Sequence, residues 1–414
     1  MKCFIFCVGL VFVTSQAFAQ TTPLFNGTGP RYALTKLGPQ ANVVIPANFI
    51  KINVGESWQA KINANPSALG FRIATGVHKN QTITPKANQQ FWGESGAIVD
   101  GTKSTRFLTQ GSASGIKFCN LVIKDYRAEF QKGVIGQHAS LMIENCEIYG
   151  TTEGFGTFLG RHILRSRLHN NAQGSWFSSR TDGAIMEDCE IWGDNVPRRY
   201  GKGGTVTSPA GLDYADWTSK FYKCTRPTVR YCYFHDLNTI AIYSDINVFD
   251  SQFYNNRILN CKAHGINLTK SYRGTLRNNW ISGCQPADNS NFRNPLGIIV
   301  YTTREVVVKD NIVENCWGAI HLWSDNVSGD YASGRWSTTG CRVENNQMTN
   351  CPVLVNLRRG SDPTDIVGAA GNNKYTGNKY KKGSAAGYLQ LNNSNRTFTQ
   401  WKAAGYDTTG SFVP

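Results

Sequence analysis

The chain has 414 residues, of which 43 are lysine or arginine and 28 are aspartate or glutamate, so its net charge is +15. It contains no zinc-finger, helix-turn-helix or RNP pattern, which argues against a nucleic-acid partner. The basic residues are scattered and form no run. Two interpretations therefore stay open: a polyanionic partner such as an acidic polysaccharide, or charge that only keeps the protein soluble.

The first 19 residues are typical of a secretory signal peptide, in which a charged residue precedes an apolar stretch and a small-residue cleavage site. Lys2 is followed by CFIFCVGLVFV, and the tripeptide AFA ends at Ala19. The apolar stretch is too short for a bilayer, which needs about 20 residues, and no later stretch approaches that length. The sequence predicts a chain without a membrane span that is exported to the periplasm or the medium.

A short unit recurs from residue 101 to residue 361, after an N-terminal cap and first coils over residues 20–100. Each unit holds a polar pair followed by strand-forming residues, as in NCEI, DCEI, NNRI and NNWI. The second residue of the pair stands at 121, 146, 166, 189, 232, 256, 279, 311 and 346, with shortest steps of 20 to 25 residues. A period of this length, with insertions, indicates one structural repeat per unit.

Cysteines form two columns in this repeat. Columns of small apolar side chains indicate buried packing positions, so mostly free thiols are expected although export would favour disulfides. No His or carboxylate cluster accompanies them, so no metal site is predicted there. One column lies five residues after an asparagine of the pair, and the other shares the slot of that asparagine: Cys261, Cys284, Cys316 and Cys351, and then Cys146, Cys189 and Cys232.

Each unit is predicted to form one coil of an all-β, right-handed parallel β-helix. Segments such as SLMIENCEI and VVVKDNIVENC alternate with a period of two and are rich in β-branched residues, whereas no segment shows a helical period. A coil of about 22 residues accommodates three short strands and their bends. The asparagines are placed at stacked turns, where they tolerate left-handed backbone and their amides can bond along the column.

The pattern resembles the pectate-lyase-like parallel β-helix superfamily over roughly residues 40 to 360, and the stretch from VGESWQAKINANPSALGF to FWGESGAIVDG is similar to its capping coil and first turns. The resemblance implies the fold. Members of that superfamily include polysaccharide lyases, glycoside hydrolases, uronate epimerases and phage depolymerases, so the resemblance does not choose an activity.

Two segments depart from the regular repeat. The insertion at residues 193–227, which carries Asp213 and Asp216, is expected to form an arm or lid over a groove, with an ordinary surface loop as the alternative. Residues 362–414 are expected to form a C-terminal tail and cap, in which a short helix from Thr397 to Ala404 covers the open edge of the solenoid.

Five strands that follow the cysteine columns, GSWFS, AIYSD, GINLT, GIIVY and AIHLW, place an aromatic and ionic stripe on one outer face. When they are aligned on their first Gly or Ala, the second and fourth following residues should face outward. Aromatic rings stack on sugars and the solenoid needs no such stripe, which favours a functional groove; the alternative is simple β-propensity. The predicted substrate-binding residues are Trp176, Arg180, Tyr243, Asn267, Tyr301, His321 and Trp323, and Ser178, Thr269, Ile299 and Asp325 lie in or next to the same stripe.

A second outward stripe is expected three residues after the turn column, and it contains Tyr149, His169, Trp192 and His235. Asp236 follows His235 and could orient its imidazole, and a plain surface histidine is the alternative.

Three functions fit these features. The first is a polysaccharide lyase that acts on an acidic polysaccharide by β-elimination, with cations that neutralise the substrate carboxylate. Lys270, Arg273 and Arg304 have that character, and LTKSYRGTLRNN is similar to the Lys-Ser and Arg-Asn layout of the alginate and dermatan lyase branch. The calcium-binding acidic cluster expected in that branch is not visible, so no cofactor is assigned and Ca²⁺ stays open.

The second function is a glycoside hydrolase in which Asp245 is paired with Asp213, Asp216 or Asp325. The third is a non-catalytic carbohydrate-binding or envelope-associated β-helix. The lyase, acting as a monomer, is the first hypothesis, and the catalytic candidates are Lys270, Arg273, Arg304, Asp245 and His235.

Overall fold

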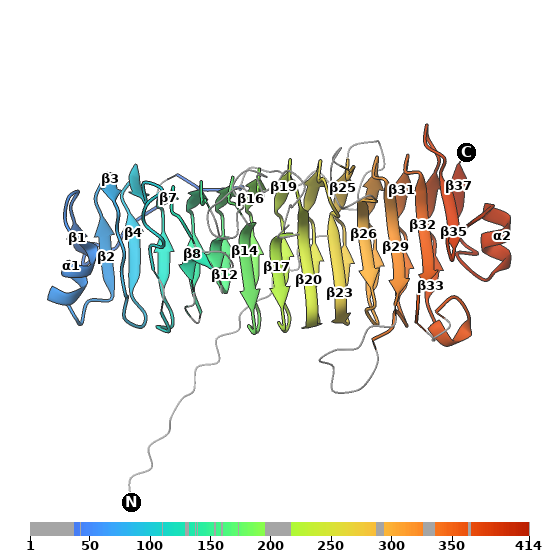
Figure 1. Cartoon of the computed structure of the whole chain (residues 1–414), viewed down its shortest axis with the longest axis horizontal. Coiled ribbons are helices and arrows are strands. Elements are labelled where there is room, and N and C mark those ends of the chain that lie inside the picture. The colour runs from blue at the N-terminus through green and yellow to red at the C-terminus, as the bar shows by residue number, and fades with distance from the viewer. Residues whose placement is uncertain are drawn as a thin grey trace, which may run out of the picture.

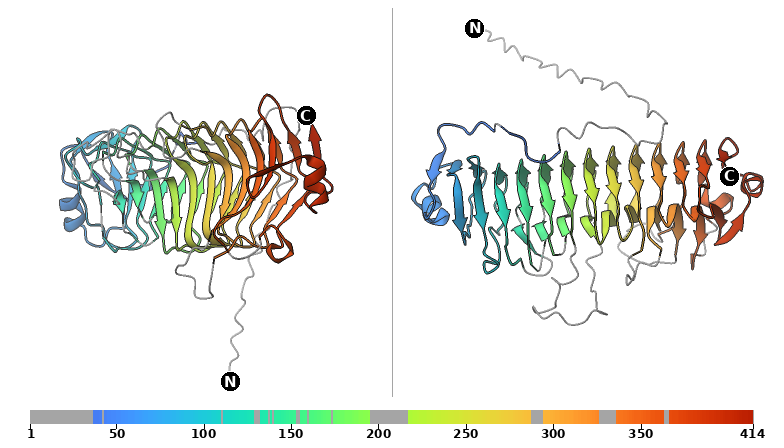
Figure 2. Two further views of the ribbon diagram at one scale, coloured as in Figure 1. Left: turned by 45° about the vertical axis from the view of Figure 1, so that its right-hand side comes forward. Right: turned by 90° about the horizontal axis from the view of Figure 1, so that it is seen from above.

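The computed structural model describes residues 37–41, 43–109, 111–128, 132–136, 138, 140–152, 155–158, 160–172, 174–194, 217–286, 294–325, 336–362 and 366–413. The expected parallel β-helix is confirmed: three sheets run along one axis, and each coil from β8 to β35 gives one strand to each sheet, whereas the first coils contribute to two sheets only (Figure 1). Two further views show the coils stacked along this axis (Figure 2). The predicted signal peptide lies outside the described residues.

Sheets A and B each contain thirteen short strands, all of them parallel to their neighbours. Sheet A consists of β1 (Ile50–Ile52), β2 (Gly70–Ile73), β4 (Gln90–Gly93), β6 (Lys117–Cys119), β9 (Met142–Glu144), β12 (His162–Leu164), β15 (Ile185–Glu187), β18 (Thr228–Arg230), β21 (Gln252–Tyr254), β24 (Thr275–Arg277), β27 (Val307–Lys309), β30 (Arg342–Glu344) and β33 (Lys374–Thr376). Sheet B consists of β3 (Gly76–Lys79), β5 (Ala97–Asp100), β7 (Val122–Lys124), β10 (Glu147–Tyr149), β13 (Arg167–His169), β16 (Glu190–Trp192), β19 (Tyr233–His235), β22 (Arg257–Leu259), β25 (Trp280–Ser282), β28 (Ile312–Glu314), β31 (Gln347–Thr349), β34 (Lys379–Lys381) and β37 (Ser411–Val413).

Sheet C has longer strands and forms the broad face seen in Figure 1. It consists of β8 (Gly133–Gly136), β11 (Phe155–Phe158), β14 (Gly174–Ser179), β17 (Trp217–Tyr222), β20 (Ile240–Phe249), β23 (Ile266–Tyr272), β26 (Leu296–Tyr301), β29 (Gly318–Ser324), β32 (Val353–Arg359), β35 (Tyr388–Leu391) and β36 (Ser394–Arg396). Only the terminal β35–β36 pair is antiparallel.

The polar pair of each repeat is the two-residue turn between sheets A and B, and its two positions have different tasks. The first position takes left-handed backbone, with φ of 60° at Asn255 and 54° at Asn278. The second position is buried and bonds along the axis: the side-chain amide of Asn256 donates to Asn279 Oδ1 at 3.0 Å, and that of Asn279 donates to Asn311 Oδ1 at 2.9 Å. Asparagine suits both positions, for different physical reasons.

This asparagine ladder continues from Asn311 through Asn346 to Asn378, whose amide donates to Asp407 Oδ2 at 2.8 Å. Each Oδ1 also accepts the backbone N–H of the preceding coil, as at Asn311, which accepts from Asn279 N at 2.9 Å. The ladder therefore fixes the spacing of coils inside the solenoid, where an unpaired amide would be costly.

The core confirms the prediction for the cysteines. All ten cysteines in the described residues are free and buried, and most of them belong to one apolar cluster that runs through the solenoid. Burial raises the pKa of the thiols of Cys146 and Cys316 well above the ordinary range. These thiols are packing groups that are protonated and shielded at neutral pH.

Helices close both ends of the solenoid (Figure 1). Helix α2 (Phe398–Ala403) has Thr397 as its N-cap with a complete capping box, which confirms the predicted C-terminal helix, and its Trp401 is fully buried. Helix α1 (Trp58–Ala64) was not predicted from the sequence. Two turns place only two apolar residues on the core side, Trp58 and Ile62, and this is too few to reveal a helical period.

Two predicted boundaries are wrong. The solenoid does not stop at residue 361, because β33, β34 and β35 add a further coil in register with the others. The insertion predicted over residues 193–227 contains β17, a full strand of sheet C that pairs with β14 and β20. A short 3₁₀ turn, η2 (Ala369–Gly371), lies near the C-terminal end.

We expect Asn311→Ala to lower the free energy of unfolding by about 3 kcal/mol, because it removes both side-chain ladder bonds and leaves buried partners unsatisfied. Chemical denaturation measures this. Asn395→Ala, at an exposed position of β36, is the control and should change stability by less than about 0.5 kcal/mol. Equal midpoints for the two variants would show that the ladder is not a source of stability.

We also expect the native protein to resist thiol reagents and the unfolded protein to react fully. The number of thiols titrated after unfolding should be the same with and without a prior reduction step, because the described cysteines are unpaired. A lower count in the unreduced sample would reveal disulfides and contradict the free-thiol core.

Candidate functional site

The register of sheet C decides which side chains face away from the core. Ile242, Leu268 and Val300 point inward, so the residues that alternate with them form two outer rows across neighbouring strands. This confirms the predicted outward direction for the stripe from β20 to β29. The first outer row holds Phe177, Lys220, Tyr243, Asn267, Ile299, His321 and Asn356; the second holds Ser179, Tyr222, Asp245, Thr269, Tyr301, Trp323 and Arg358.

The predicted outward direction of Trp176 and Ser178 is wrong. Trp176 pairs in register with Ser219, which aligns with the inward Ile242, and its ring is fully buried against Phe221. Its indole N–H donates to the Gly160 carbonyl at 3.1 Å. The alignment on Gly174 was shifted by one residue, and such a shift exchanges the two faces of a strand. Trp176 therefore cannot be a substrate-binding residue.

The outer rows contain an ion pair at their centre. Lys220 Nζ lies 2.7 Å from Asp245 Oδ2, and the two side chains are only 11% and 12% exposed. The ammonium also lies 3.9 Å from the ring centre of Trp217 and 5.0 Å from that of Tyr243. We call Trp217, Lys220, Tyr222, Tyr243 and Asp245 the ion-pair cluster.

The fold does not need this ion pair for its stability. Removing two charges from water costs roughly what their attraction returns, so a buried pair seldom stabilises a fold. The inward face of sheet C already supplies the core, and apolar side chains would fill these outer positions at no such cost. Charged groups that are held rigidly between aromatic rings are instead suited to bind and polarise a sugar.

The sequence did not identify Lys220, although Asp245 and Tyr243 were both predicted. The strand WTSKFY begins without the Gly or Ala on which the others were aligned, and it follows the insertion, where the repeat step is longest. The alternation of Trp217, Ser219 and Phe221 with Lys220 and Tyr222 is the one signal that could have revealed it.

A second group of polar side chains lies further along the same rows, beyond Ile299. The hydroxyl of Tyr301 donates to Asp325 Oδ2 at 3.0 Å, and the guanidinium of Arg358 lies 4.1 Å from the ring centre of Trp323. Burial, together with the bond to Asp325, raises the pKa of Tyr301 to about 12. We call this group the distal cluster; it consists of Tyr301, His321, Trp323, Asp325, Asn356 and Arg358.

His321 is neutral in the distal cluster. Burial, followed by smaller effects of His264 and Arg358, lowers the pKa of its imidazole to about 3.

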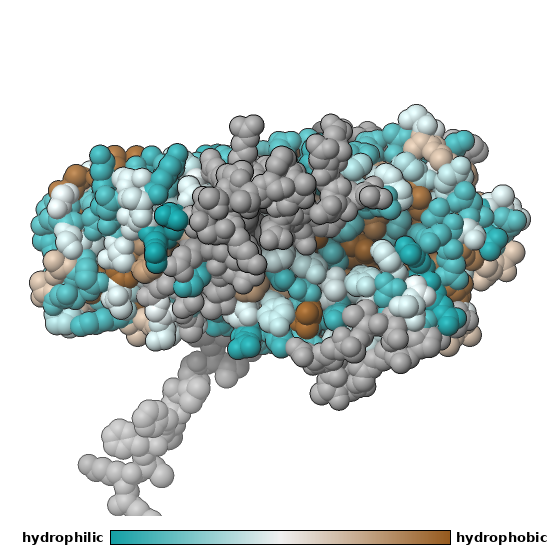
Figure 3. All heavy atoms as spheres, in the orientation of Figure 1, coloured by the Kyte–Doolittle hydropathy of each residue, from teal (hydrophilic) through white to brown (hydrophobic). Residues whose placement is uncertain are grey.

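Figure 3 shows this face of the molecule, with apolar surface set in a hollow among polar groups over the strands near β26.

The predicted cations are not members of the outer rows: Lys270 lies near the end of β23, and Arg180, Arg273 and Arg304 follow the ends of their strands. Arg180 is exposed directly after β14, and Lys270 follows Thr269, the register partner of Asp245. Arg273 makes a double contact with Asp250, at 2.6 and 2.9 Å, which raises the pKa of its guanidinium. Arg304 pairs by a backbone bridge with Tyr272. The carboxylate of Asp245 contacts Lys220.

His235 does not lie near Asp245, because it belongs to sheet B. Its ring stacks on Trp192 at 5.6 Å, and Trp192 stacks on His169 at 4.0 Å, which stacks on Tyr149 at 4.7 Å. Its Nδ1 lies 2.8 Å from Asp236, as the sequence suggested. The predicted second stripe is present, and its rings cover one another's faces. Because His235 lies on sheet B and Asp245 on sheet C, the two side chains cannot act on one bond.

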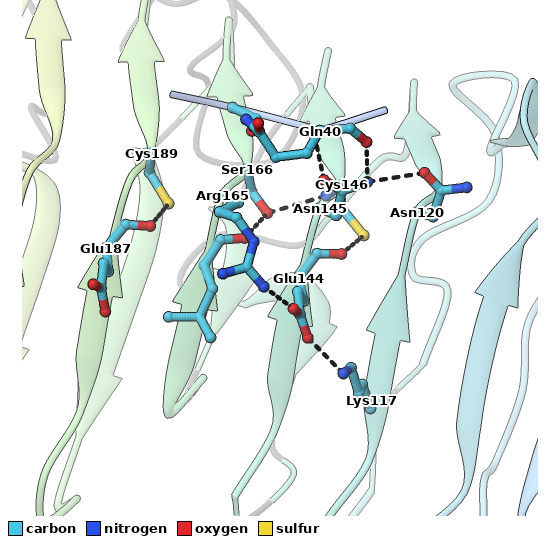
Figure 4. A network of polar contacts seen from close by, with 12 residues as sticks. Gln40, Lys117, Asn120, Glu144, Asn145, Cys146, Arg165, Ser166, Glu187 and Cys189 are labelled. Atoms are coloured by element: carbon cyan, nitrogen blue, oxygen red, sulfur yellow. Dashed lines mark hydrogen bonds and ion pairs between the residues drawn. The ribbon is translucent and has the colours of Figure 1, made fainter. Parts of the chain in front are cut away.

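A polar network on the turns between sheets A and B is structural (Figure 4). Asn145 donates to the Gln40 carbonyl at 3.0 Å and to Asn120 Oδ1 at 2.9 Å, so residues 37–41 lie across several coils. Glu144 bridges Lys117 at 2.5 Å and Arg165. Every group in it has a protein partner, and it lies away from the outer rows of sheet C.

Within the part of the chain that the structure describes, no three His, Cys, Asp or Glu side chains group together as a metal site, and no helix is long and apolar enough to cross a membrane. Asp213 and Asp216, the predicted hydrolase partners, lie outside the described residues.

Comparison with known proteins agrees with the fold. A family model described as "Right handed beta helix region" matches residues 133–328. A mannuronic-acid-specific polysaccharide family 6 lyase from human gut microbiota is 12% identical with a TM-score of 0.55, and the match covers 88% of this chain and 86% of the lyase.

Two further structures match with lower TM-scores. A family 6 polysaccharide lyase from Pseudopedobacter saltans is 14% identical with a TM-score of 0.48, over 88% of this chain and 91% of that one. The catalytic domain of a GH87 alpha-1,3-glucanase is 11% identical with a TM-score of 0.46, over 91% of this chain and 69% of that one. No curated protein sequence matches this chain at a significant level. At 12% identity the match to the gut-microbiota lyase shows the fold alone.

A buried carboxyl group, that of Asp194 after β16, should make stability depend on pH. Burial raises the pKa of Asp194 to about 7, although the N–H of Asn171 at 3.0 Å and the hydroxyl of Ser175 at 2.5 Å bond to its carboxylate. The native state then holds more protons than the unfolded state between about pH 4 and pH 7, so this contribution is present below that window and is lost as pH rises through it.

We expect the wild-type free energy of unfolding to fall by at most about 4 kcal/mol between pH 4 and pH 8 through this group, and Asp194→Asn to flatten the profile. Denaturant titrations at several pH values measure both. Identical pH profiles for the two proteins would show that Asp194 ionises normally.

Proposed function

We propose that this chain, a right-handed parallel β-helix protein, is an exported enzyme that cleaves an acidic polysaccharide by β-elimination, with Lys220 and Asp245 as its catalytic pair. The single observation that carries the proposal is their 2.7 Å ion pair on the outer face of sheet C, enclosed by Trp217 and Tyr243. The gut-microbiota lyase performs cleavage of a uronate polymer on the same fold, which supports the class of reaction.

The chemistry of β-elimination matches what this pair offers. A uronate carboxylate competes with Asp245 for the Lys220 ammonium, which neutralises it and makes the C5 proton more acidic. Asp245, released from the pair, accepts that proton. The C5–H electron pair forms the C4=C5 double bond, the C4–O bond breaks, and the leaving oxygen takes a proton from the Tyr243 hydroxyl, which solvent later restores. The aromatic rings of Trp217 and Tyr222 hold the sugar during these steps.

Among the residues that the structure describes, the hydrolase alternative lacks a second carboxylate at the required distance. Asp325 is the other carboxylate beside the described part of the outer rows, and it follows β29, three strands from Asp245 on β20. Three strand spacings are about 14 Å, whereas glycosidase carboxylates are about 5 to 9.5 Å apart. The geometry of the described residues therefore favours the lyase.

The predicted cations at the ends of the sheet C strands have a binding role in this proposal. Lys270, Arg273 and Arg304 succeed one another along the edge of sheet C, with Arg180 on an earlier coil. A polyuronate lying along the outer rows would bring its remaining carboxylates to this edge. The net charge of +15 acts in the same direction by attracting a polyanion.

The test is an assay for the ultraviolet absorbance of the unsaturated uronate product, on alginate, pectate, glucuronan and glycosaminoglycans, with and without Ca²⁺. We expect Lys220→Met and Asp245→Asn each to lower kcat by about 10²–10⁴-fold on the polymer that is cleaved. Asp182→Asn, which removes an exposed carboxylate paired with Arg226, is the matched control and should leave kcat unchanged.

Cleavage that survives both substitutions but is lost in Lys270→Ala would keep the lyase and move its centre to the edge cations. Reducing ends without the unsaturated product would identify a hydrolase. Binding of these polymers without any cleavage would leave a carbohydrate-binding β-helix and overturn the enzymatic proposal.

A further inference from the structure

We propose that the distal cluster is a separate binding subsite for one uronate residue of the polymer, several sugars away from the ion pair. This subsite proposal rests on the proposed function in one respect only, that the ligand is a polyuronate. Asp245 lies on β20, whereas Trp323 and Arg358 lie on β29 and β32, three and four strands further along sheet C. These steps correspond to about 14–19 Å along the solenoid axis.

Three polar atoms in the distal cluster are buried without a hydrogen-bond partner among the described residues: His321 Nε2, Trp323 Nε1 and Asn356 Oδ1. His321 and Asn356 are register partners in the first outer row and are only 7% and 5% exposed. Buried polar groups in proteins are almost always satisfied, so neighbouring unsatisfied groups indicate a missing ligand or solvent. One is a donor, one an acceptor and one either, which matches the hydroxyl groups of a sugar.

The guanidinium of Arg358 makes the distal cluster suited to an acidic sugar. Arg358 has no carboxylate partner in the described part of the chain, and its guanidinium lies over Trp323, its partner in the second outer row. Other arginines near sheet C, such as Arg226 and Arg273, are held by aspartates. A planar guanidinium that no carboxylate occupies is suited to take one from the ligand.

The supporting side chains are already fixed in place. The amide of Asn356 donates to Asn393 Oδ1 at 2.9 Å, which leaves its Oδ1 turned away and available. Asp325 accepts the Ser361 N–H at 2.9 Å and the Tyr301 hydroxyl at 3.0 Å. Its carboxylate lies so close to Gly360 that a Cβ there would be 1.7 Å from Oδ1, so this position requires glycine. A site that is set before binding pays little ordering entropy.

The test is equilibrium binding of uronate oligosaccharides, measured by calorimetry in an Asp245→Asn background so that no ligand is cleaved. The probes are a disaccharide and a hexasaccharide from alginate, pectate and glucuronan, with a neutral glucan hexasaccharide. We expect Arg358→Ala and Asn356→Ala each to weaken binding of one uronate hexasaccharide by about tenfold or more, because each loses a hydrogen bond. Disaccharide binding should not change, and Arg358→Lys should recover part of the loss.

Arg277→Ala is the matched control. Its guanidinium lies 4.2 Å from the ring centre of Tyr254 on sheet A, which is the same kind of contact on another face, and binding should be unchanged. Thermal unfolding of each variant verifies that it is folded.

The outcomes separate this proposal from the previous one. Length-dependent binding that needs Arg358, in a protein that cleaves no polymer, would keep the subsite and remove the lyase. Cleavage with hexasaccharide binding that is indifferent to both substitutions would keep the lyase and remove the subsite. Equal affinity for the neutral hexasaccharide, or no binding of any oligosaccharide, would also overturn the subsite.

Discussion

The asparagine ladder is the constraint on which the rest of this molecule depends. Each buried amide donates to the next coil through its side chain and accepts the backbone N–H of the preceding coil, as Asn311 does with Asn346 and Asn279. Parallel strands alone would allow coils to shift relative to one another. A column of buried amides that are satisfied only in one register prevents such a shift, because any displacement would leave several of them unpaired.

A fixed register has a consequence on the opposite side of the coil. Because neighbouring coils stack in a fixed register, the outward residues of sheet C line up in two rows. Side chains more than twenty residues apart in the sequence become neighbours. Lys220 and Asp245 meet in this way, and so do His321 and Asn356. The core needs only the inward half of each strand, so the outward half is available for charged and aromatic groups that do not stabilise the fold.

The two outer clusters differ in their chemistry. In the ion-pair cluster a charge is already matched, by Asp245 for Lys220, so a substrate must displace one partner before it binds. In the distal cluster, among the described residues, Arg358 has no carboxylate partner and three buried atoms have no hydrogen-bond partner. An ion pair that exchanges one partner for the substrate is suited to a chemical step in which charge is rearranged. Polar groups without a hydrogen-bond partner are suited to binding a ligand without a chemical step. This difference supports the proposed roles, cleavage for the ion-pair cluster and recognition for the distal cluster.

The sequence by itself determined the β-helix, the turn asparagines, the buried thiols and the C-terminal cap, since each of these repeats with the coil or follows a local capping rule. It placed Asp245, Tyr243, His321 and Trp323 on the outer face for the same reason. Only the tertiary structure decided that Trp176 is buried, that Lys220 is the partner of Asp245, and that His235 lies on another sheet. Those facts depend on the register between coils. An insertion makes that register hard to predict from the sequence, and an error of one residue moves each side chain to the other face of the sheet.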